Sequence, residues 1–250
     1  MGTVRTNYLL HLRHRLGTAC VLPSVVPYSR LEASEVFASN GAMLNSESFP
    51  SGEKDSKALL IVLHGLGDSS AGFRQLPIAL NLPWLNYLLV NAPDPYYGGY
   101  SWYDFTGDEA KGIERSRGLL LDFLAQCRKQ GFPPDQTTLF GFSQGCLMTI
   151  DVGFRFPDRL AGLVGVSGYV HRPDRLLNDL SPVARSQRML FTHGTADPLV
   201  PCAKVREDVK KLVAAGLTIE WREYNKGHTI AGEEELSAIR DFIKAGYSPK

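Results

Sequence analysis

The stretch LFGFSQGCL, Leu139 to Leu147, interrupts apolar residues with two glycines that flank a serine. Gly141-Phe142-Ser143-Gln144-Gly145 fits the pattern G-x-S-x-G, between a strand-like and a helix-like segment. In that context the chain turns sharply, and the serine hydroxyl projects from the carboxyl end of the strand. Side chains at the flanking positions would collide with the neighbouring strand and helix. The stretch therefore predicts a nucleophilic serine, with a glycine-rich turn and an incidental serine as the alternative.

Further apolar runs alternate with helical patterns along the chain. The expected strands are 58–65, 86–93, 137–143, 160–168, 188–194 and 218–224, and the expected helices are 109–129, 145–156, 203–215 and 233–244. Strands that are apolar throughout are buried on both faces, and their alternation with helices is typical of a mostly parallel sheet. We expect one α/β domain over 44–250, with helices on both faces of the sheet. Residues 45–57 are polar and are interpreted as an exposed approach to the first strong strand.

The composition excludes several classes of protein. Of 250 residues, 44% are hydrophobic and 21% are charged, and the formal net charge of +1 gives no sign of nucleic-acid binding. No run of 18 apolar residues is present, so we expect no stable membrane insertion. The cysteines form no C-x-x-C pair and are interpreted as reduced thiols of a reducing compartment, which favours the cytoplasm: Cys20, Cys127, Cys146 and Cys202.

Residues 1–43 differ from the rest and are interpreted as a divergent N-terminal extension. Residues 1–31 contain four arginines and no acidic residue, and they lack the apolar core of a secretory signal. This pattern resembles an organelle transit peptide, and Gly2 with Thr6 also fits a loose myristoylation pattern. The alternatives are an upstream extension with the functional start at Met43, a disordered segment, or an arm packed on the domain.

A serine hydroxyl needs a base, and in this topology an acid and then a histidine follow the serine, each after a later strand. Of the six histidines, only His228, in NKGHTI, follows the last expected strand. Asp197, in THGTADPLVP, is the expected acid, and Asp174 and Asp179 are rivals upstream of the preceding strand. A loop histidine and a turn-forming aspartate are the alternative interpretations.

The tetrahedral intermediate of acyl transfer also needs N–H donors for its oxyanion. The residue after the serine begins a helix, so the N–H of Gln144 faces the space where the oxyanion would form. LHGLGDSSAGF, 63–73, follows an early strand and supplies the N–H of Leu66, although another glycine turn is possible there. No two histidines lie at metal-ligand spacing with a carboxylate partner, so we expect no metal and no cofactor.

Five stretches together resemble the phospholipase/carboxylesterase family of α/β-hydrolases, which includes the acyl-protein thioesterases. They are LHGLGDSSAGF, NAPDPYYGGYSWYDF, LFGFSQG, HGTADPLVP and GHTI, in family order between about Ala58 and Lys244. The resemblance implies an α/β-hydrolase fold and these roles: nucleophile Ser143, base His228, acid Asp197, oxyanion donors Leu66 and Gln144, and Trp102 in the substrate loop. Cys146 stands where the family commonly has a second glycine, and this larger residue is expected to tighten the packing while leaving the triad intact.

The resemblance further implies hydrolysis of carboxylic esters or thioesters without a cofactor, on a small-molecule ester or an acylated protein. Lysophospholipase activity and a non-catalytic binding module on a hydrolase scaffold are the alternatives. About twenty residues separate VGVSGY from RMLF, too few for a large lid domain. The apolar neighbours of the expected site suggest an acyl-binding surface or belong to the core, and the core is favoured for the aliphatic ones: Leu66, Trp102, Leu199, Val200 and Ile230.

Overall fold

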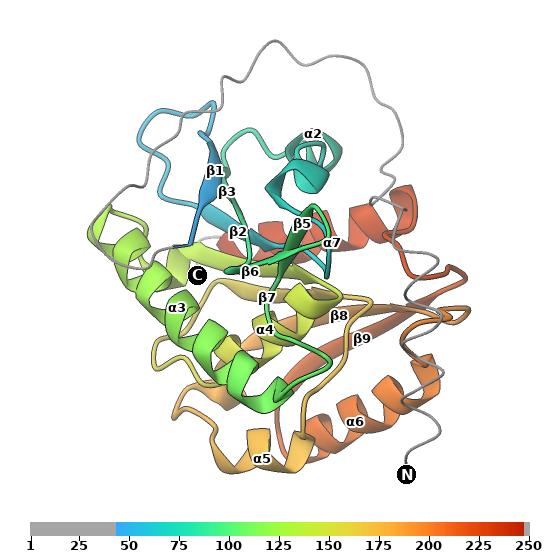
Figure 1. The fold of residues 1–250 in the computed structure, drawn as a ribbon. Helices are drawn as coiled ribbons and strands as arrows, with labels where there is room; N and C mark the ends of the chain where they lie inside the picture. The colour runs from blue at the N-terminus through green and yellow to red at the C-terminus, as the bar shows by residue number, and fades with distance from the viewer. Residues whose placement is uncertain (1–43, 248–250) are drawn as a thin grey trace.

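A seven-stranded sheet runs through residues 44–247, the part of the chain that this computed structural model describes (Figure 1). Its strands are β1 (Ser46–Phe49), β2 (Leu59–Leu63), β3 (Asn86–Val90), β6 (Thr137–Phe142), β7 (Gly162–Val166), β8 (Arg188–Gly194) and β9 (Thr218–Tyr224). The order across the sheet is β1-β3-β2-β6-β7-β8-β9. Strand β1 is antiparallel to β3, and the other neighbours are parallel. The strand that leads into the G-x-S-x-G stretch, β6, is therefore central.

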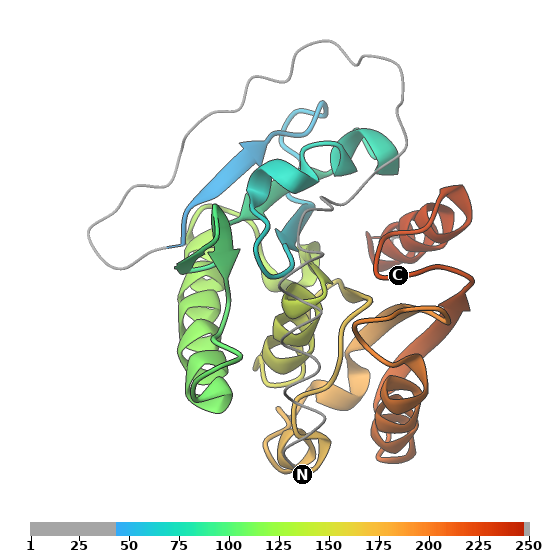
Figure 2. The ribbon, with the colours of Figure 1, turned by 45° about the vertical axis from the view of Figure 1, so that its right-hand side comes forward.

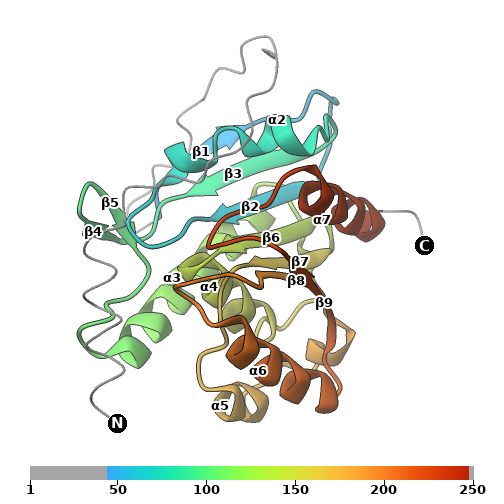
Figure 3. The same cartoon turned by 90° about the vertical axis from the view of Figure 1, so that its right-hand side faces the viewer.

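Helices cover both faces of this sheet, as expected. On one face α3 (Glu109–Lys129), α4 (Gln144–Gly153) and α6 (Cys202–Ala214) lie in a row (Figure 2), with the short α5 (Pro173–Asn178) beside α6. On the other face lie α2 (Leu76–Leu80) and α7 (Glu233–Tyr247) (Figure 3). Both faces of the sheet are covered because both are apolar. In β2, Ile61 packs into one hydrophobic cluster, and its neighbours Leu60 and Val62 pack into the other.

Every strand and helix expected from the sequence is present, with ends that differ by a few residues. The interpretation of residues 45–57 as an exposed approach is wrong at its start, because β1 pairs with β3 from Ser46 opposite Val90 to Phe49 opposite Tyr87. Local pattern gave no signal, since SESF contains a single apolar residue. The strand forms because the outer edge of β3 needs backbone partners, and Phe49 adds apolar burial.

A small hairpin, β4 (Asp94–Tyr96) and β5 (Gly99–Ser101), was also missed. Its turn places Tyr97 and Gly98 at positive φ, 44° and 90°. The hairpin is bound to the loop that follows β2, because the N–H of Gly67 donates to the carbonyl of Tyr100 at 2.9 Å and the N–H of Tyr100 donates to Asp68 at 2.9 Å. It therefore supports the loop that contains the predicted donor Leu66.

The connection between β7 and β8 contains only α5 and a 3-10 turn, η3 (Ala184–Ser186), so no large lid domain is inserted at this point of the fold. Within residues 44–247, no helix combines the length and the apolar character that a bilayer crossing requires. The predictions for the N-terminal extension, including Gly2, Cys20 and Met43, fall outside the described residues, as do residues 248–250.

Candidate active site

Ser143 lies on the sharp turn between β6 and α4, with φ 55° and ψ −115°. This positive φ is strained for a residue with a side chain. The N–H of Ser143 donates to the carbonyl of Val166 at 2.9 Å, which ties the turn to β7. A Cβ on Gly145 would lie 2.1 Å from the carbonyl oxygen of Leu63, and one on Gly141 would lie 2.1 Å from that of Gly145. The steric explanation for both glycines is therefore confirmed.

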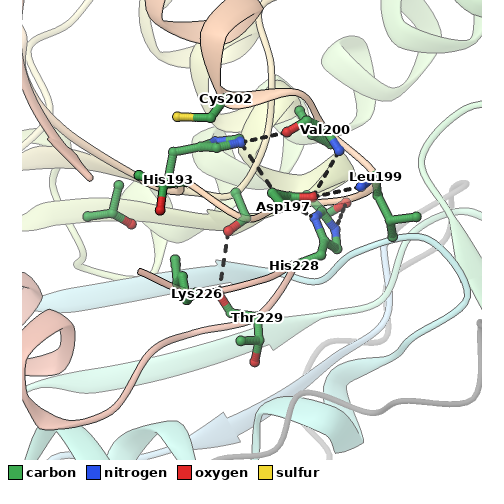
Figure 4. A network of polar contacts seen from close by, with 12 residues as sticks. His193, Asp197, Leu199, Val200, Cys202, Lys226, His228 and Thr229 are labelled. Carbon is green, nitrogen blue, oxygen red and sulfur yellow. Dashed lines mark hydrogen bonds and ion pairs between the residues drawn. The ribbon is translucent and has the colours of Figure 1, made fainter. Parts of the chain in front are cut away.

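The carboxyl ends of β6, β8 and β9 bring three predicted residues into one hydrogen-bonded line. Nε2 of His228 lies 2.9 Å from Oγ of Ser143. Nδ1 of His228 lies 2.8 Å from Oδ2 of Asp197, and Figure 4 shows these two residues side by side. The Asp197 side chain is fully buried, while 14% of the His228 side chain is exposed, and Ser143 is half-buried. The serine is thus reachable from solvent, and the carboxylate is shielded.

The environment of Asp197 favours a charged carboxylate. Its Oδ1 accepts hydrogen bonds from the N–H groups of Leu199 and Val200, each at 2.9 Å. Burial by itself raises the pKa of Asp197, but the bond from His228 and these two N–H groups outweigh it and hold the pKa below its ordinary value. An ionised Oδ2 accepts a hydrogen bond from the Nδ1–H of His228, which leaves the Nε2 lone pair facing the hydroxyl of Ser143.

A second histidine, His193, supports the loop of the acid. Its Nε2 lies 3.0 Å from the carbonyl of Val200 and 3.7 Å from Oδ2 of Asp197, and its ring stacks on Trp221. Burial lowers the pKa of His193, so the neutral ring donates Nε2–H to the carbonyl. The sequence does not predict that His193 supports this loop. The stacking partner of His193, Trp221, lies on β9 and meets β8 only in the folded sheet.

The loop of His228 is held at both ends by one carboxylate. Nζ of Lys226 lies 2.5 Å from Oε1 of Glu235, and the N–H of Ala231 donates to Oε2 of the same residue. Lys226 is 7% exposed and Glu235 is fully buried. The carbonyl of Lys226 also accepts from Ala196 at 3.2 Å, which joins this loop to the loop of the acid. These positioning residues were missed, since a charged pair nine residues apart has no local signature.

The rival acids lie elsewhere. Asp174 forms an ion pair with Lys211 at 2.8 Å, and Asp179 forms ion pairs with Arg155 at 3.5 Å and with Arg175 at 3.9 Å. Both aspartates lie in or beside α5. The structure therefore brings Asp197, and neither rival, to His228.

Of the predicted oxyanion donors, Leu66 lies in the loop after β2, and Gln144 directly follows Ser143 as the first residue of α4. Among the described residues, the N–H groups of Leu66 and Gln144 donate to no protein acceptor, and Gln144 opens α4, where N–H groups have no partner within the helix. The Gln144 side chain is buried and bridged to one segment: Oε1 accepts from the N–H of Trp102 at 3.0 Å and from Ser101 Oγ at 3.3 Å, and Nε2 donates to Tyr103 at 2.9 Å.

Two of the predicted substrate-binding residues require correction. Trp102 is fully buried, and its indole Nε1–H donates to the carbonyl of His64 at 2.9 Å. Ile230 is 4% exposed and packs in the cluster under α2 and α7. Neither presents a surface to a substrate, because each fills core space between packed elements. Leu66 and Leu199 are half-buried and are the predicted apolar contacts that keep exposed surface, whereas Val200 is buried.

Cys146 replaces the second glycine without a clash because its neighbours are glycines. It is fully buried, and a Cβ on Gly168 would lie 2.4 Å from Cys146 Cβ, while one on Gly165 would lie 2.7 Å from its Sγ. Cys127 and Cys202 are likewise free and buried. Within residues 44–247, no group of three or more His, Cys, Asp or Glu residues could hold a metal ion.

A mostly parallel sheet with this serine turn at its centre, and with acid and histidine following on later strands, is the α/β-hydrolase arrangement. A sequence profile of the phospholipase/carboxylesterase family matches residues 44–246. The chain belongs to this family, and it is accordingly a carboxylic ester hydrolase.

Individual relatives agree with this assignment. Acyl-protein thioesterase 1 of Schizosaccharomyces pombe is 32% identical over 169 residues, which cover 62% of this chain and 75% of that protein. The crystal structure of esterase PE8 covers 81% of this chain and 98% of its own, with 28% identity and a TM-score of 0.71. Zea mays acyl-protein thioesterase 2 covers 82% and 99%, with a TM-score of 0.68, and at 24% identity the likeness concerns the fold alone.

Proposed function

We propose that this protein is a serine hydrolase that cleaves carboxylic esters or thioesters through an acyl-enzyme, with Ser143, His228 and Asp197 as its triad. The observation that carries the proposal is the continuous line of hydrogen bonds, 2.9 Å from Ser143 Oγ to His228 Nε2 and 2.8 Å from His228 Nδ1 to Asp197 Oδ2. A non-catalytic binding module would not need a strained serine aligned with a base and a buried carboxylate.

The mechanism follows from this geometry. Oγ of Ser143 attacks the acyl carbonyl carbon while Nε2 of His228 takes the hydroxyl proton, and Asp197 stabilises the imidazolium. The carbonyl electrons move onto oxygen, where the N–H groups of Leu66 and Gln144 receive the negative charge. The intermediate collapses, and His228 protonates the departing alcohol or thiol. Water then attacks the acyl-enzyme with His228 as base, and the carboxylic acid leaves.

For the substrate class, we propose an acyl ester or acyl thioester, on a small molecule or a protein. Two features support this: relatives carry the name acyl-protein thioesterase, and the half-buried Leu66 and Leu199 flank the site with apolar surface. The short connection between β7 and β8 inserts no large lid, which is compatible with a bulky leaving group. We place the enzyme in the cytoplasm, in keeping with free thiols at Cys127, Cys146 and Cys202.

The decisive experiment compares wild type with Ser143→Ala on p-nitrophenyl esters of graded chain length and on an acylated-peptide thioester. We expect kcat to fall by roughly 10⁴- to 10⁶-fold, as in other serine triads, while the melting temperature stays near that of wild type. A fluorophosphonate probe should label wild type at Ser143. Labelling or activity that survives in Ser143→Ala would contradict the assignment, and hydrolysis confined to lysophospholipids would replace the proposed substrate class.

A further inference from the structure

We propose that His64 and Trp102 are positioning residues that set the direction of the Leu66 N–H and anchor the side chain of Gln144, through a buried chain of hydrogen bonds that joins one predicted oxyanion donor to the other. The inference rests on the proposed function and adds to it two buried residues outside the triad. His64 is 1% exposed and Trp102 is fully buried. His64 follows β2 and Trp102 follows β5, and a Cβ on Gly145, in the first turn of α4, would lie 2.8 Å from the carbonyl oxygen of His64.

The first link orients the peptide unit between Gly65 and Leu66. Nδ1 of His64 lies 2.6 Å from the carbonyl oxygen of Gly65. The described chain has no cis peptide, so the C=O of Gly65 and the N–H of Leu66 point in opposite directions within one rigid plane. Holding the carbonyl on the imidazole therefore turns the N–H of Leu66 away from the core and toward the open side of its loop.

The second link fixes the tautomer that this bond requires. The N–H of Ala92 donates to Nε2 of His64 at 3.0 Å. Because a backbone N–H only donates, Nε2 is the unprotonated nitrogen, and Nδ1 carries the proton that the carbonyl of Gly65 accepts. The ring of His64 lies beside the rings of Tyr100 and Trp102, with centroid distances of 6.3 and 5.7 Å. Burial lowers the pKa of His64 despite Asp68, so the neutral tautomer persists at working pH.

The third link joins this peptide to the other donor. The indole N–H of Trp102 donates to the carbonyl of His64 at 2.9 Å, and the backbone N–H of Trp102 donates to Gln144 Oε1 at 3.0 Å. The carbonyl of Trp102 accepts from Ser116 Oγ on α3. One tryptophan thus fixes His64, which aims the N–H of Leu66, and also fixes the side chain of Gln144, whose own backbone N–H is the second donor.

The consequence is specific to catalysis. Oxyanion donors act on the charge that develops in the transition state, so their misalignment lowers kcat and leaves substrate binding nearly unchanged. Removing one donor outright costs about 10²- to 10³-fold in kcat. Misdirecting one should cost less, and we expect about 10- to 10²-fold for the loss of the bond from His64 to Gly65.

The test compares two amides at position 64. His64→Gln places its amide near the position of the imidazole Nε2 in wild type. It therefore keeps an acceptor for the N–H of Ala92 and loses the hydrogen bond to the carbonyl of Gly65. His64→Asn places its amide near Nδ1 and keeps that bond. We expect His64→Gln to lower kcat about 10- to 10²-fold with KM changed less than about threefold. The affinity for a trifluoromethyl ketone, whose tetrahedral adduct carries the oxyanion, should fall by the same factor. His64→Asn should recover most of the loss, and Trp102→Phe should show a smaller loss of the same kind.

Tyr247→Phe is the matched control, because it also removes a hydrogen bond to β2, the partly buried bond from the hydroxyl of Tyr247 to the carbonyl of Leu59 at 2.8 Å, at the opposite end of the strand. It should lower the melting temperature and leave kcat and inhibitor affinity unchanged. If wild type lacks Ser143-dependent hydrolysis, the proposed function fails. If wild type has it and both His64→Gln and Trp102→Phe keep kcat and inhibitor affinity within about twofold, only the positioning role fails. Should His64→Gln not fold, Trp102→Phe and His64→Asn decide the question by the same measurements.

Discussion

Asp197 shows how surroundings determine the behaviour of one side chain. In the loop after β8, its carboxylate accepts hydrogen bonds from two backbone N–H groups and from the Nδ1–H of His228. These bonds hold it in one orientation and keep it charged although its side chain is fully buried. The role proposed for Asp197 therefore depends on its charge as much as on its position.

We expect Asp197→Asn to lower kcat by about 10²- to 10⁴-fold with KM within a few-fold of wild type, because an amide reverses the tautomer preference of His228 without touching substrate. Steady-state kinetics on a p-nitrophenyl ester measures this directly. Asp174→Asn is the matched control, since that carboxylate pairs with Lys211 in solvent. A large loss in Asp174→Asn beside a silent Asp197→Asn would contradict the acid assignment.

The lowered pKa of Asp197 also predicts how stability depends on pH. A depressed folded-state pKa stabilises the fold fully above the unfolded value, near 3.9, and this contribution disappears as the pH falls through the folded pKa. The difference in unfolding free energy between wild type and Asp197→Asn should therefore be largest near pH 7 and shrink below about pH 4. Urea unfolding over that range measures it, and a difference that stays constant with pH would show that charge is not responsible.

At the scale of elements, the site depends on how closely α4 approaches β2. Gly145, in the first turn of the helix, faces the carbonyl of Leu63 at the end of that strand. A side chain there has nowhere to go, because the obstacle is backbone and not the end of a flexible side chain. The same close approach places the start of α4, with the predicted donor Gln144, beside the end of β2. The contact that packs the helix on the sheet therefore also positions a predicted oxyanion donor.

Gly145→Ala should therefore destabilise the protein by about 3 kcal/mol or more, or prevent its folding. Gly118→Ala is the control, since it lies on an exposed position of α3 with nothing within 4 Å of the new Cβ. That change should raise stability by about 0.5 to 1 kcal/mol through helix propensity. Chemical unfolding of both variants checks the pair. Equal stability of Gly145→Ala and wild type would mean that α4 can retreat from β2.

The loop between β9 and α7 depends on the buried pair of Lys226 and Glu235. Glu235→Gln retains an oxygen for the N–H of Ala231 and removes the charge opposite the ammonium. We expect a loss of about 3 to 5 kcal/mol, because one buried charge is left without its counterpart. Adding Lys226→Met should restore most of it, since replacing both charges removes the desolvation cost. Urea unfolding measures both variants, and an unstable double variant would mean that the pair itself is required.

At the scale of the whole molecule, the sheet order explains why distant segments meet. The parallel strands from β2 to β9 all end at the same edge, so the residues after β2, β6, β8 and β9 gather there whatever their separation along the chain. His228 reaches Ser143 across 85 positions. Among the described residues, Leu44 is already buried in the core, and β1 follows it at one edge of the sheet.

A chain that starts at Met43 keeps all the described elements and every residue assigned to the site. We expect it to fold with kcat/KM within a few-fold of the full-length protein, measured on the same esters. A chain that starts at Lys57 lacks β1 and leaves the edge of β3 unpaired, so it should lose stability or aggregate. An inactive or insoluble chain from Met43 would show that residues 1–42 belong to the working domain.

Much of this architecture can be predicted from short stretches of the sequence and from their order. Apolar runs such as Leu59–Leu63 predict buried strands from their composition, and the glycines around Ser143 predict the turn from backbone sterics. The order of serine, acid and histidine pointed to Asp197 and His228 because the topology of parallel strands imposes it. Each of these inferences needs only the neighbours of a residue in the chain, or the order of segments along it.

Tertiary structure decided the rest. Strand β1 forms because β3 has an open edge. The four residues of β1 are mostly polar, so their sequence does not predict a strand. Trp102 and Ile230 are apolar residues beside predicted site segments, and only the packing shows that they are core. The role inferred for His64 depends on Gly65 on one side and on Ala92, 28 positions away, on the other. Hydrogen bonds between distant segments leave no period or spacing in a sequence, because the fold alone brings their partners together.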